Sequence, residues 1–142
     1  MKRLKKEAEQ RQAVEMLCTD MLVPREHLLR KIDAAVNFAR IYELVEDFYC
    51  EDNGRPSCDP VVLFKLVMIQ HLFGIRSLRQ TMRDAEVNVA YRWFLGYTMS
   101  QQLPHFATIS YAFRHRFTAE VIEGVLRWIL EEVARTGYLS PE

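Results

Sequence analysis

Residues 60–73 read PVVLFKLVMIQHLF, and ten of these fourteen residues are large and apolar. Their side chains would occupy nearly every direction around a helix, a pattern typical of a membrane span or of the central helix of a bundle. Fourteen helical residues rise about 21 Å, which is less than the roughly 30 Å of a bilayer core. Lys65, Gln70 and His71 also interrupt the apolar run. We therefore predict a buried central helix over 60–73.

Both ends of this helix are marked by residues that commonly cap helices. Asp59 can accept hydrogen bonds from the free N–H groups of the first turn, and Pro60 suits the first helical position because it has no N–H. Gly74 supplies the left-handed residue that often follows a helix. Before the helix, residues 50–60 (CEDNGRPSCDP) form a turn-rich segment in which Arg55 either binds phosphate or pairs with a nearby acid.

A second helix is predicted after Gly74, because Ser77 followed by Gln80 matches the capping-box pattern. The apolar residues of this helix would form its inward face, namely Leu78, Met82 and Ala85. Its outward face is basic and carries Arg76, Arg79 and Arg83. Like charges one turn apart cost an isolated helix about 0.2–0.5 kcal/mol, which an anion opposite them would offset. We predict that these arginines contact phosphate, with pairing to Asp84 or Glu86 as the alternative.

Residues 88–96 read NVAYRWFLG and predict a short helix between two layers, because one helical face cannot bury its four large apolar side chains together. Trp93 is expected in the core. For Arg92, which lies among these aromatic residues, stacking or burial with a partner is the alternative to a DNA contact.

A loop at 98–104 leads to Thr108, which is predicted to cap a helix over 109–117. The inner face of this helix would consist of Ile109, Ala112, Phe113 and Phe117. Its outer face would consist of Ser110, Tyr111, Arg114 and His115, and Arg116 adds a positive charge near its end. These residue types hydrogen-bond phosphates and base edges. We predict a recognition helix that binds DNA, with a merely solvated face as the alternative.

The C-terminal part predicts a long amphipathic helix over 119–135, capped by Thr118 and ended by Gly137. Its apolar stripe consists of Ile122, Val125, Leu126, Ile129 and Val133. Its outer face alternates in charge along Glu123, Arg127, Glu131 and Arg135, which indicates a solvated surface without a binding role. Trp128 lies off the apolar stripe and is a candidate contact with another domain or subunit.

The N-terminal part predicts two further helices. Residues 3–19 form a weakly amphipathic pattern whose basic start is either a solvated tail or a DNA contact. After a short helical turn around 26–31, Asp33 is predicted to cap a helix over 34–49. The apolar residues of that helix recur at the helical period, at Phe38, Ile41, Val45 and Phe48.

The charge of the chain is unevenly distributed, although the net charge is zero. Residues 1–60 contain ten Lys/Arg against twelve Asp/Glu, and residues 118–142 contain two against five. Residues 61–117 contain seven against two, so that only the middle of the chain is basic. This distribution indicates a local face for an anionic ligand.

The cysteines and histidines do not predict a metal or disulfide site. Cys18, Cys50 and Cys58 show no Cys-x-x-Cys spacing, and the four histidines are scattered. Residues 1–15 are charged throughout and are followed by no apolar signal segment. We therefore expect a cytoplasmic protein with no cofactor, no small-molecule substrate and no membrane partner.

No segment shows the alternation of a half-buried strand, so the chain is predicted to be all-α. Short turns join the four helices of the middle of the chain, over 60–73, 77–87, 88–96 and 109–117. This order is compatible with a multi-helix bundle that has a helix-turn-helix-like DNA-binding arrangement around the central helix.

Three blocks of this sequence resemble the N-terminal domain of bacterial insertion-sequence transposases of the InsH-like type. They are VPREHLLRKID (23–33), GRPSCDPVVLFKL (54–66) and YRWFLG (91–96), in the order and spacing of that family. The resemblance covers roughly residues 22–139, which leaves 1–21 as a charged N-terminal helix or tail. It implies a helical domain that recognises the terminal inverted repeats of a mobile element in double-stranded DNA and helps to assemble the transposition complex. Residues 105–107 (HFA) differ from the polar residues that the family more often has there.

The catalytic chemistry of such transposases lies in a following ribonuclease-H-like domain, where three carboxylates, Asp-Asp-Glu, hold two divalent metal ions. This chain shows no strand pattern that would position such acids. The resemblance therefore implies a chain truncated before the catalytic core, with no transposition activity alone. Its expected function is DNA binding. The alternative is a protein–protein module that dimerises the transposase through Trp128 and the N-terminal helix, as a homo-oligomer without sequence-specific DNA binding.

Overall fold

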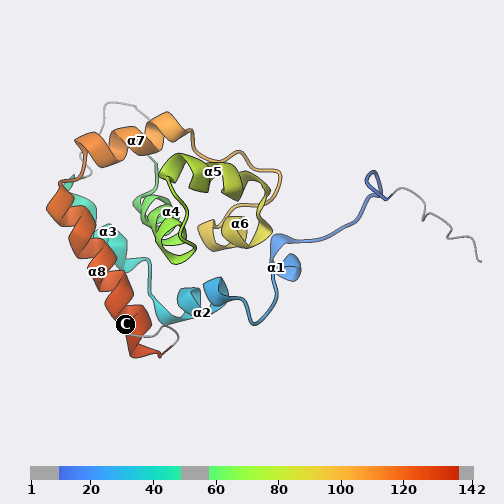
Figure 1. Cartoon of the computed structure of the whole chain (residues 1–142), viewed down its shortest axis with the longest axis horizontal. Coiled ribbons are helices and arrows are strands. Elements are labelled where there is room, and N and C mark those ends of the chain that lie inside the picture. The colour runs from blue at the N-terminus through green and yellow to red at the C-terminus, as the bar shows by residue number, and fades with distance from the viewer. Residues whose placement is uncertain (1–9, 49–57, 138–142) are drawn as a thin grey trace, which may run out of the picture.

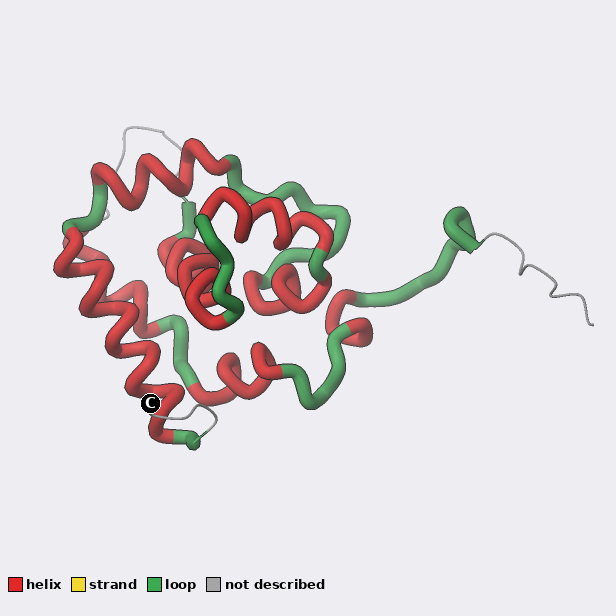
Figure 2. The backbone as a smooth tube through the Cα atoms, in the orientation of Figure 1, coloured by secondary structure: helices red, strands yellow, loops and turns green. Residues whose placement is uncertain are grey.

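The computed structural model of the chain describes residues 10–48 and 58–137, and all regular elements in this part are helices. In chain order they are α1 (Thr19–Leu22), α2 (Leu28–Ala35), α3 (Arg40–Val45), the 3-10 helix η1 (Glu46–Phe48), α4 (Pro60–Leu72), α5 (Leu78–Val87), α6 (Val89–Leu95), α7 (Phe106–His115) and α8 (Ala119–Arg135). Helix α4 lies in the middle and most of the others surround it (Figures 1 and 2). The prediction of an all-α bundle around this helix is confirmed for the described residues, whereas Arg55 lies outside them.

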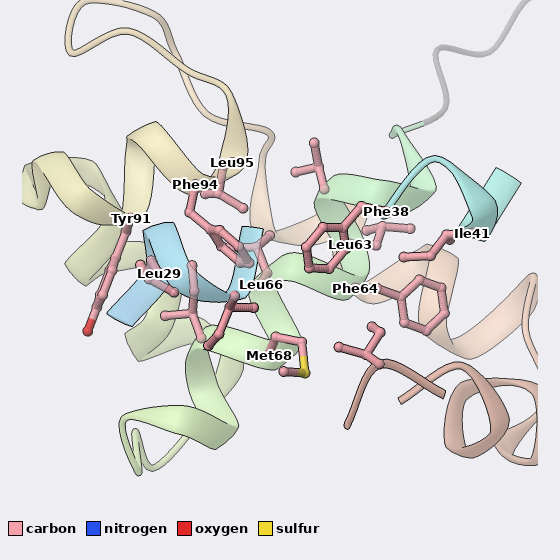
Figure 3. Packing of buried hydrophobic residues seen from close by; sticks show 14 of the residues in the cluster. Leu29, Phe38, Ile41, Leu63, Phe64, Leu66, Met68, Tyr91, Phe94 and Leu95 are labelled. Carbon is pink, nitrogen blue, oxygen red and sulfur yellow. The ribbon is translucent and has the colours of Figure 1, made fainter. Parts of the chain in front are cut away.

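Helix α4 is apolar on nearly all sides because it packs against neighbours on nearly all sides. Leu63 and Phe64 are both 0% exposed, and Figure 3 shows side chains from several helices converging on them. The start of the helix is capped as predicted, since Asp59 Oδ1 accepts a hydrogen bond from the Val61 N–H at 2.8 Å. Gly74 follows its end with a φ of 61°, in the left-handed region.

Lys65 is the one lysine or arginine of α4, and it is largely buried. Its Nζ donates a hydrogen bond to the Phe94 carbonyl oxygen at 2.7 Å and pairs with Asp33 at 3.6 Å. The same Nζ lies 4.7 Å from the centre of the Phe38 ring and 4.8 Å from that of Phe94. Burial lowers the pKa of Lys65, while the charge of Asp33 opposes this shift. Lys65 thus joins α4 to α2 and α6 through a satisfied polar contact inside the core.

The prediction of a single helix over 34–49 is wrong, because the chain forms two helices there and the first of them begins earlier. The chain instead forms α2, which contains Asp33 and is capped by His27, whose Nδ1 accepts from the Leu29 N–H at 3.0 Å. Val36 then takes an extended conformation before α3 begins. This break lets Val36 and Phe38 both face the core, at 4% and 6% exposed. A continuous helix would turn residues two apart toward different sides, so tertiary packing decides the break.

The helix predicted over 3–19 is also not observed in residues 10–18, which the structure describes. Residues 10–18 contain no helix, and this segment leads away from the bundle (Figure 1). Val14 and Met16 on it are 98% and 99% exposed. A short helix is marginal in water unless an apolar face packs on a neighbour, and none of the helices in residues 19–48 and 58–137 lies beside this segment.

Helix α1 anchors this segment to the bundle through Asp20. Asp20 Oδ1 accepts hydrogen bonds from Arg30 Nη1 at 3.0 Å and from Trp93 Nε1 at 2.9 Å, while the Arg30 guanidinium lies 4.6 Å from the centre of the Trp93 ring. The bond from Arg30, followed by that from Trp93, holds the pKa of Asp20 below its ordinary value. Trp93, which was predicted to lie in the core, is half-buried beside it and uses its N–H for this contact.

The predicted caps of α5 and α8 are confirmed. Ser77 Oγ accepts from the Gln80 N–H at 3.0 Å, and Thr118 Oγ1 accepts from the Val121 N–H at 3.2 Å. Helix α6 ends at Gly96, which has a φ of 88°. No helix in the described part of the chain is long and apolar enough to span a membrane.

One prediction about the C-terminal helices needs correction. Helix α7 begins at Phe106 rather than at residue 109, because His105 provides the cap through Nδ1, which accepts from the Ala107 N–H at 3.1 Å. Thr108 therefore lies inside the helix. Trp128 is half-buried and packs against the core cluster, so it does not offer a fully exposed ring to another subunit.

Candidate nucleic-acid interface

The three arginines predicted on the second helix form an exposed basic face at the start and along the outside of α5. Arg76 lies just before the cap, and Arg79 and Arg83 follow on the helix; all three are exposed. None of them pairs with an acid in the described residues. Asp84, the alternative partner, instead accepts a hydrogen bond from Gln80 Nε2 at 2.8 Å. The positive charge of this face is therefore not neutralised within the described part of the chain.

The basic face borders a surface cleft of about 480 Å³ between α5 and the segment that leads into α7. We call it the α5–α7 cleft. Its apolar lining residues are Met82, Val87, Leu103, Pro104 and Phe106. Its polar lining residues are Arg79, Arg83, Glu86, Arg92, Gln102 and His105. The cleft thus combines an apolar lining with cationic and hydrogen-bonding groups.

Arg92 ties α5 to the loop on the other side of this cleft. It is 5% exposed, and its guanidinium donates hydrogen bonds to the carbonyl oxygens of Glu86 at 3.1 Å, Thr98 at 2.7 Å and Gln101 at 2.6 Å. Glu86 belongs to the α5 wall, whereas Thr98 and Gln101 belong to the loop that forms the opposite wall. Between the two interpretations left open by the sequence, the structure supports burial with partners. Arg92 holds together the elements that line the cleft, and its guanidinium N–H groups donate to backbone carbonyl oxygens.

Arg79 links the α5 side of the cleft to α7. Its guanidinium carbon lies 4.1 Å from the centre of the Phe106 ring, within the range of a cation–π contact. Such stacking uses the flat face of the guanidinium and leaves its N–H groups free to donate to an anion. The contact therefore joins the basic face of α5 to the first residue of α7.

The outer face of α7 carries most of the residues predicted to read bases. Tyr111, Arg114 and His115 are exposed, and the rings of Tyr111 and His115 lie 4.5 Å apart. Ser110 is half-buried, and so is Arg116, which follows the last residue of the helix. Of the residues predicted for this helix, three are thus presented together and two are partly covered.

Helix α7 is held on the bundle by its inner aromatic residues. Phe64 of α4 contacts Phe113 and Phe117, with ring centres 5.9 Å and 5.5 Å apart. Together with the Arg79–Phe106 contact, this packing orients the exposed side of α7 away from the core. Gln102, His105 and Phe106 line the cleft but were missed as site residues. The signal for His105 and Phe106 was the atypical HFA segment directly before the predicted helix, whereas Gln102 had no such signal.

A family model for a transposase domain, DUF772, matches residues 17–116. The chain belongs to this transposase-domain family. No significant match to the chain was found among curated proteins or among solved structures. The expected membership of a transposase family is thereby confirmed, while the narrower InsH-like type stays a prediction.

The transposase-domain match begins just before α1 and ends at Arg116, the residue that follows α7. It therefore includes the Asp20 anchor, the central helix, the α5–α7 cleft and the outer face of α7. Helix α8 lies outside the match and packs on the bundle through the fully buried Ile129 and Val133.

Replacing Arg92 with lysine is expected to lower the free energy of unfolding by about 2–4 kcal/mol, because an ammonium cannot reproduce the guanidinium fork and buried carbonyls lose charged donors. Urea unfolding measures this change. Arg83→Lys, at an exposed position of the same cleft, is the matched control and is expected to stay within about 0.5 kcal/mol. Equal stabilities of the two variants would show that the three carbonyl contacts do not support the fold.

Proposed function

We propose that this chain is a DNA-binding domain of a transposase that recognises the terminal inverted repeats of its element. The observation that carries the proposal is the joined surface of α5 and α7. The arginines of α5 have no acidic partner among the described residues, and the Arg79–Phe106 contact at 4.1 Å joins them to α7, whose outer face is exposed. Membership of the transposase-domain family supports duplex DNA as the ligand.

The two helices have different roles in this proposal. Arg76, Arg79 and Arg83 of the basic face contact phosphates, which sets the position of the domain on the duplex without reading its sequence. The outer face of α7 reads base edges in the major groove with Tyr111, Arg114 and His115, and Ser110 and Arg116 contribute at its margins. Arginine is suited to guanine because its fork donates to O6 and N7 together.

Binding to a labelled duplex that carries an element end, compared with a scrambled duplex, tests this function. Both are measured at several salt concentrations. We expect a slope of log K against log salt near −3.6 if each of the four exposed arginines contacts a phosphate, namely Arg76, Arg79, Arg83 and Arg114. A fifth contact, from Arg116, makes the slope steeper, at about −4.5. Preference for the element end with this slope supports the proposal. Absence of binding to either duplex at low salt refutes it.

Replacing Arg114 with alanine is expected to weaken binding to the element end by about 1–3 kcal/mol and to reduce the preference over the scrambled duplex. The loss of a base contact removes sequence information, whereas the loss of a phosphate contact weakens both duplexes equally. Arg127→Ala, at an exposed position on α8, is the matched control and leaves both affinities unchanged. An unchanged preference in Arg114→Ala would remove this residue from base reading.

A second candidate function is self-association through the N-terminal segment. Val14 and Met16 are almost fully exposed on a segment that leads away from the bundle, where they offer apolar surface to a second copy of the chain. We expect light scattering over a dilution series to show a dimer that the double variant Val14→Ser, Met16→Ser shifts toward monomer. A monomer at all concentrations contradicts this second function and leaves DNA binding untouched.

A further inference from the structure

The α5–α7 cleft has a shape and chemistry that phosphate contacts along a duplex do not require. A surface for a DNA backbone needs positive charge on an open face, and the exposed arginines of α5 already supply it. The cleft is instead a hollow in which five apolar residues lie beside six polar or charged ones, and its volume of about 480 Å³ falls within the range of small-molecule sites. A duplex cannot enter a space of this size, whereas one flat heterocycle with its sugar can.

The cleft is also built in advance, since contacts within the protein join the elements that line it. The buried Arg92 guanidinium ties Glu86 of α5 to Thr98 and Gln101 of the loop that continues into the other wall, and the Arg79–Phe106 contact joins α5 to α7. A preformed site binds its ligand without paying to order its own side chains. Its shape is therefore a property of the fold rather than of a mobile surface.

The groups around the cleft match the phosphate and the base of a nucleotide. The guanidinium groups of Arg79 and Arg83 suit a phosphate, and the apolar lining with Val87 at its edge suits a base. Gln102 and His105 offer donors and acceptors to the polar edge of that base. Glu86 is the one acid in the lining, and it disfavours a second phosphate at its end of the cleft.

We propose that the α5–α7 cleft binds a single unpaired nucleotide of DNA, with the base between the two walls and its phosphate on Arg79 and Arg83. The inference rests on the proposed DNA-binding function and deepens it. Taking a base out of an intact duplex costs pairing and stacking energy, whereas a base that is already unpaired avoids this cost. The domain therefore prefers DNA with an unpaired nucleotide over fully paired DNA of the same sequence.

Three duplexes of one sequence test this inference by fluorescence anisotropy at one salt concentration. The first is fully paired, the second carries a one-nucleotide bulge, and the third carries the same bulge with an abasic sugar. We expect the bulged duplex to bind about tenfold more tightly than the paired one, and the abasic bulge to lose this gain. The abasic duplex bends as a bulge does, so it separates recognition of the base from recognition of bent DNA.

Two variants that fill the cleft complete the test. Val87→Trp and Gln102→Trp change exposed residues on opposite walls without altering charge. Each is expected to abolish the preference for the bulge while affinity for the paired duplex stays unchanged. Ala134→Trp, at an exposed position on α8, is the matched control and keeps the preference. Circular dichroism verifies that all three variants are folded.

The outcomes distinguish this inference from the function on which it rests. Equal affinity for paired and bulged duplexes overturns the inference and leaves DNA binding standing. The same holds if the abasic bulge binds as tightly as the intact one, or if both cleft-filling variants keep the preference. Absence of binding to every duplex overturns the proposed function and the inference together.

Discussion

Reversing the charge of both Arg79 and Arg83 to glutamate is expected to weaken binding to every duplex by about 100-fold or more at moderate salt. Two phosphate contacts are lost, which reduces the salt slope by about 1.8, and two acids then repel the backbone. Because phosphate contacts carry no sequence information, the element end and the scrambled duplex are affected alike. Anisotropy titrations of both duplexes over a salt series measure the affinities and the slope.

A matched control separates a local contact from the overall charge of the protein. Arg127→Glu with Arg135→Glu reverses two exposed arginines on α8 and changes the net charge by the same amount. This pair is expected to change the affinity by less than about threefold, because its charges are not on the proposed face and salt screens distant charges. An equal loss in both double variants would mean that net charge, and not α5, attracts the DNA.

Conservative substitutions address the structural role of Arg79. Its glutamate variant also loses the contact with Phe106, so the start of α7 loses a neighbour as well as a charge. The double variant Arg79→Lys, Arg83→Lys keeps both charges and is expected to retain most of the affinity for DNA. If it binds as weakly as the double glutamate variant, the stacking of Arg79 matters more than its charge.

Replacing Phe64 with alanine is expected to lower the free energy of unfolding by about 3–5 kcal/mol. Phe64 is 0% exposed at the centre of the bundle, and its ring contacts Phe113 and Phe117. The substitution removes a buried ring and leaves a cavity that these neighbours cannot fill without moving α7. Since domains of this size are stable by about 5–15 kcal/mol, the variant is still expected to fold, with a much lower urea midpoint.

Two comparisons test this explanation for Phe64. Phe64→Leu keeps most of the apolar volume and is expected to recover more than half of the lost stability. Phe73→Ala, at a residue of the same segment that is 38% exposed, is expected to cost clearly less than Phe64→Ala. A loss below about 1 kcal/mol in Phe64→Ala would mean that α7 does not depend on α4 for its position.

The sequence was sufficient for features that depend on residues close together in the chain. The caps at Asp59, Ser77 and Thr118 were predicted from single residues, because a cap joins a side chain to an N–H only a few positions away. The central helix was predicted to be buried because it has more apolar residues than one face of a helix can hold. The arginines of the basic face on α5 are exposed, as their spacing along the helix predicts.

Predictions failed where a distant neighbour decided the local structure. The break between α2 and α3 follows from the burial of both Val36 and Phe38 against the bundle, which no local pattern records. The absence of a helix in residues 10–18 follows from the lack of a helix beside that segment. Helix α7 starts early because His105 caps it, although histidine is not among the residues that favour this position.

The sequence by itself determined that the protein is helical, approximately where α4, α5, α6 and α8 begin and end, and that its middle part is basic. Only the tertiary structure decided that Arg92 is a buried anchor and that Arg79 stacks on Phe106, 27 positions further along the chain. The α5–α7 cleft depends on both contacts. Helical periodicity reports which side of one helix is apolar, but it carries no information about which helix that side meets. The cleft lies where α5 and the segment leading into α7 pack together, and for that reason it exists only in the folded chain.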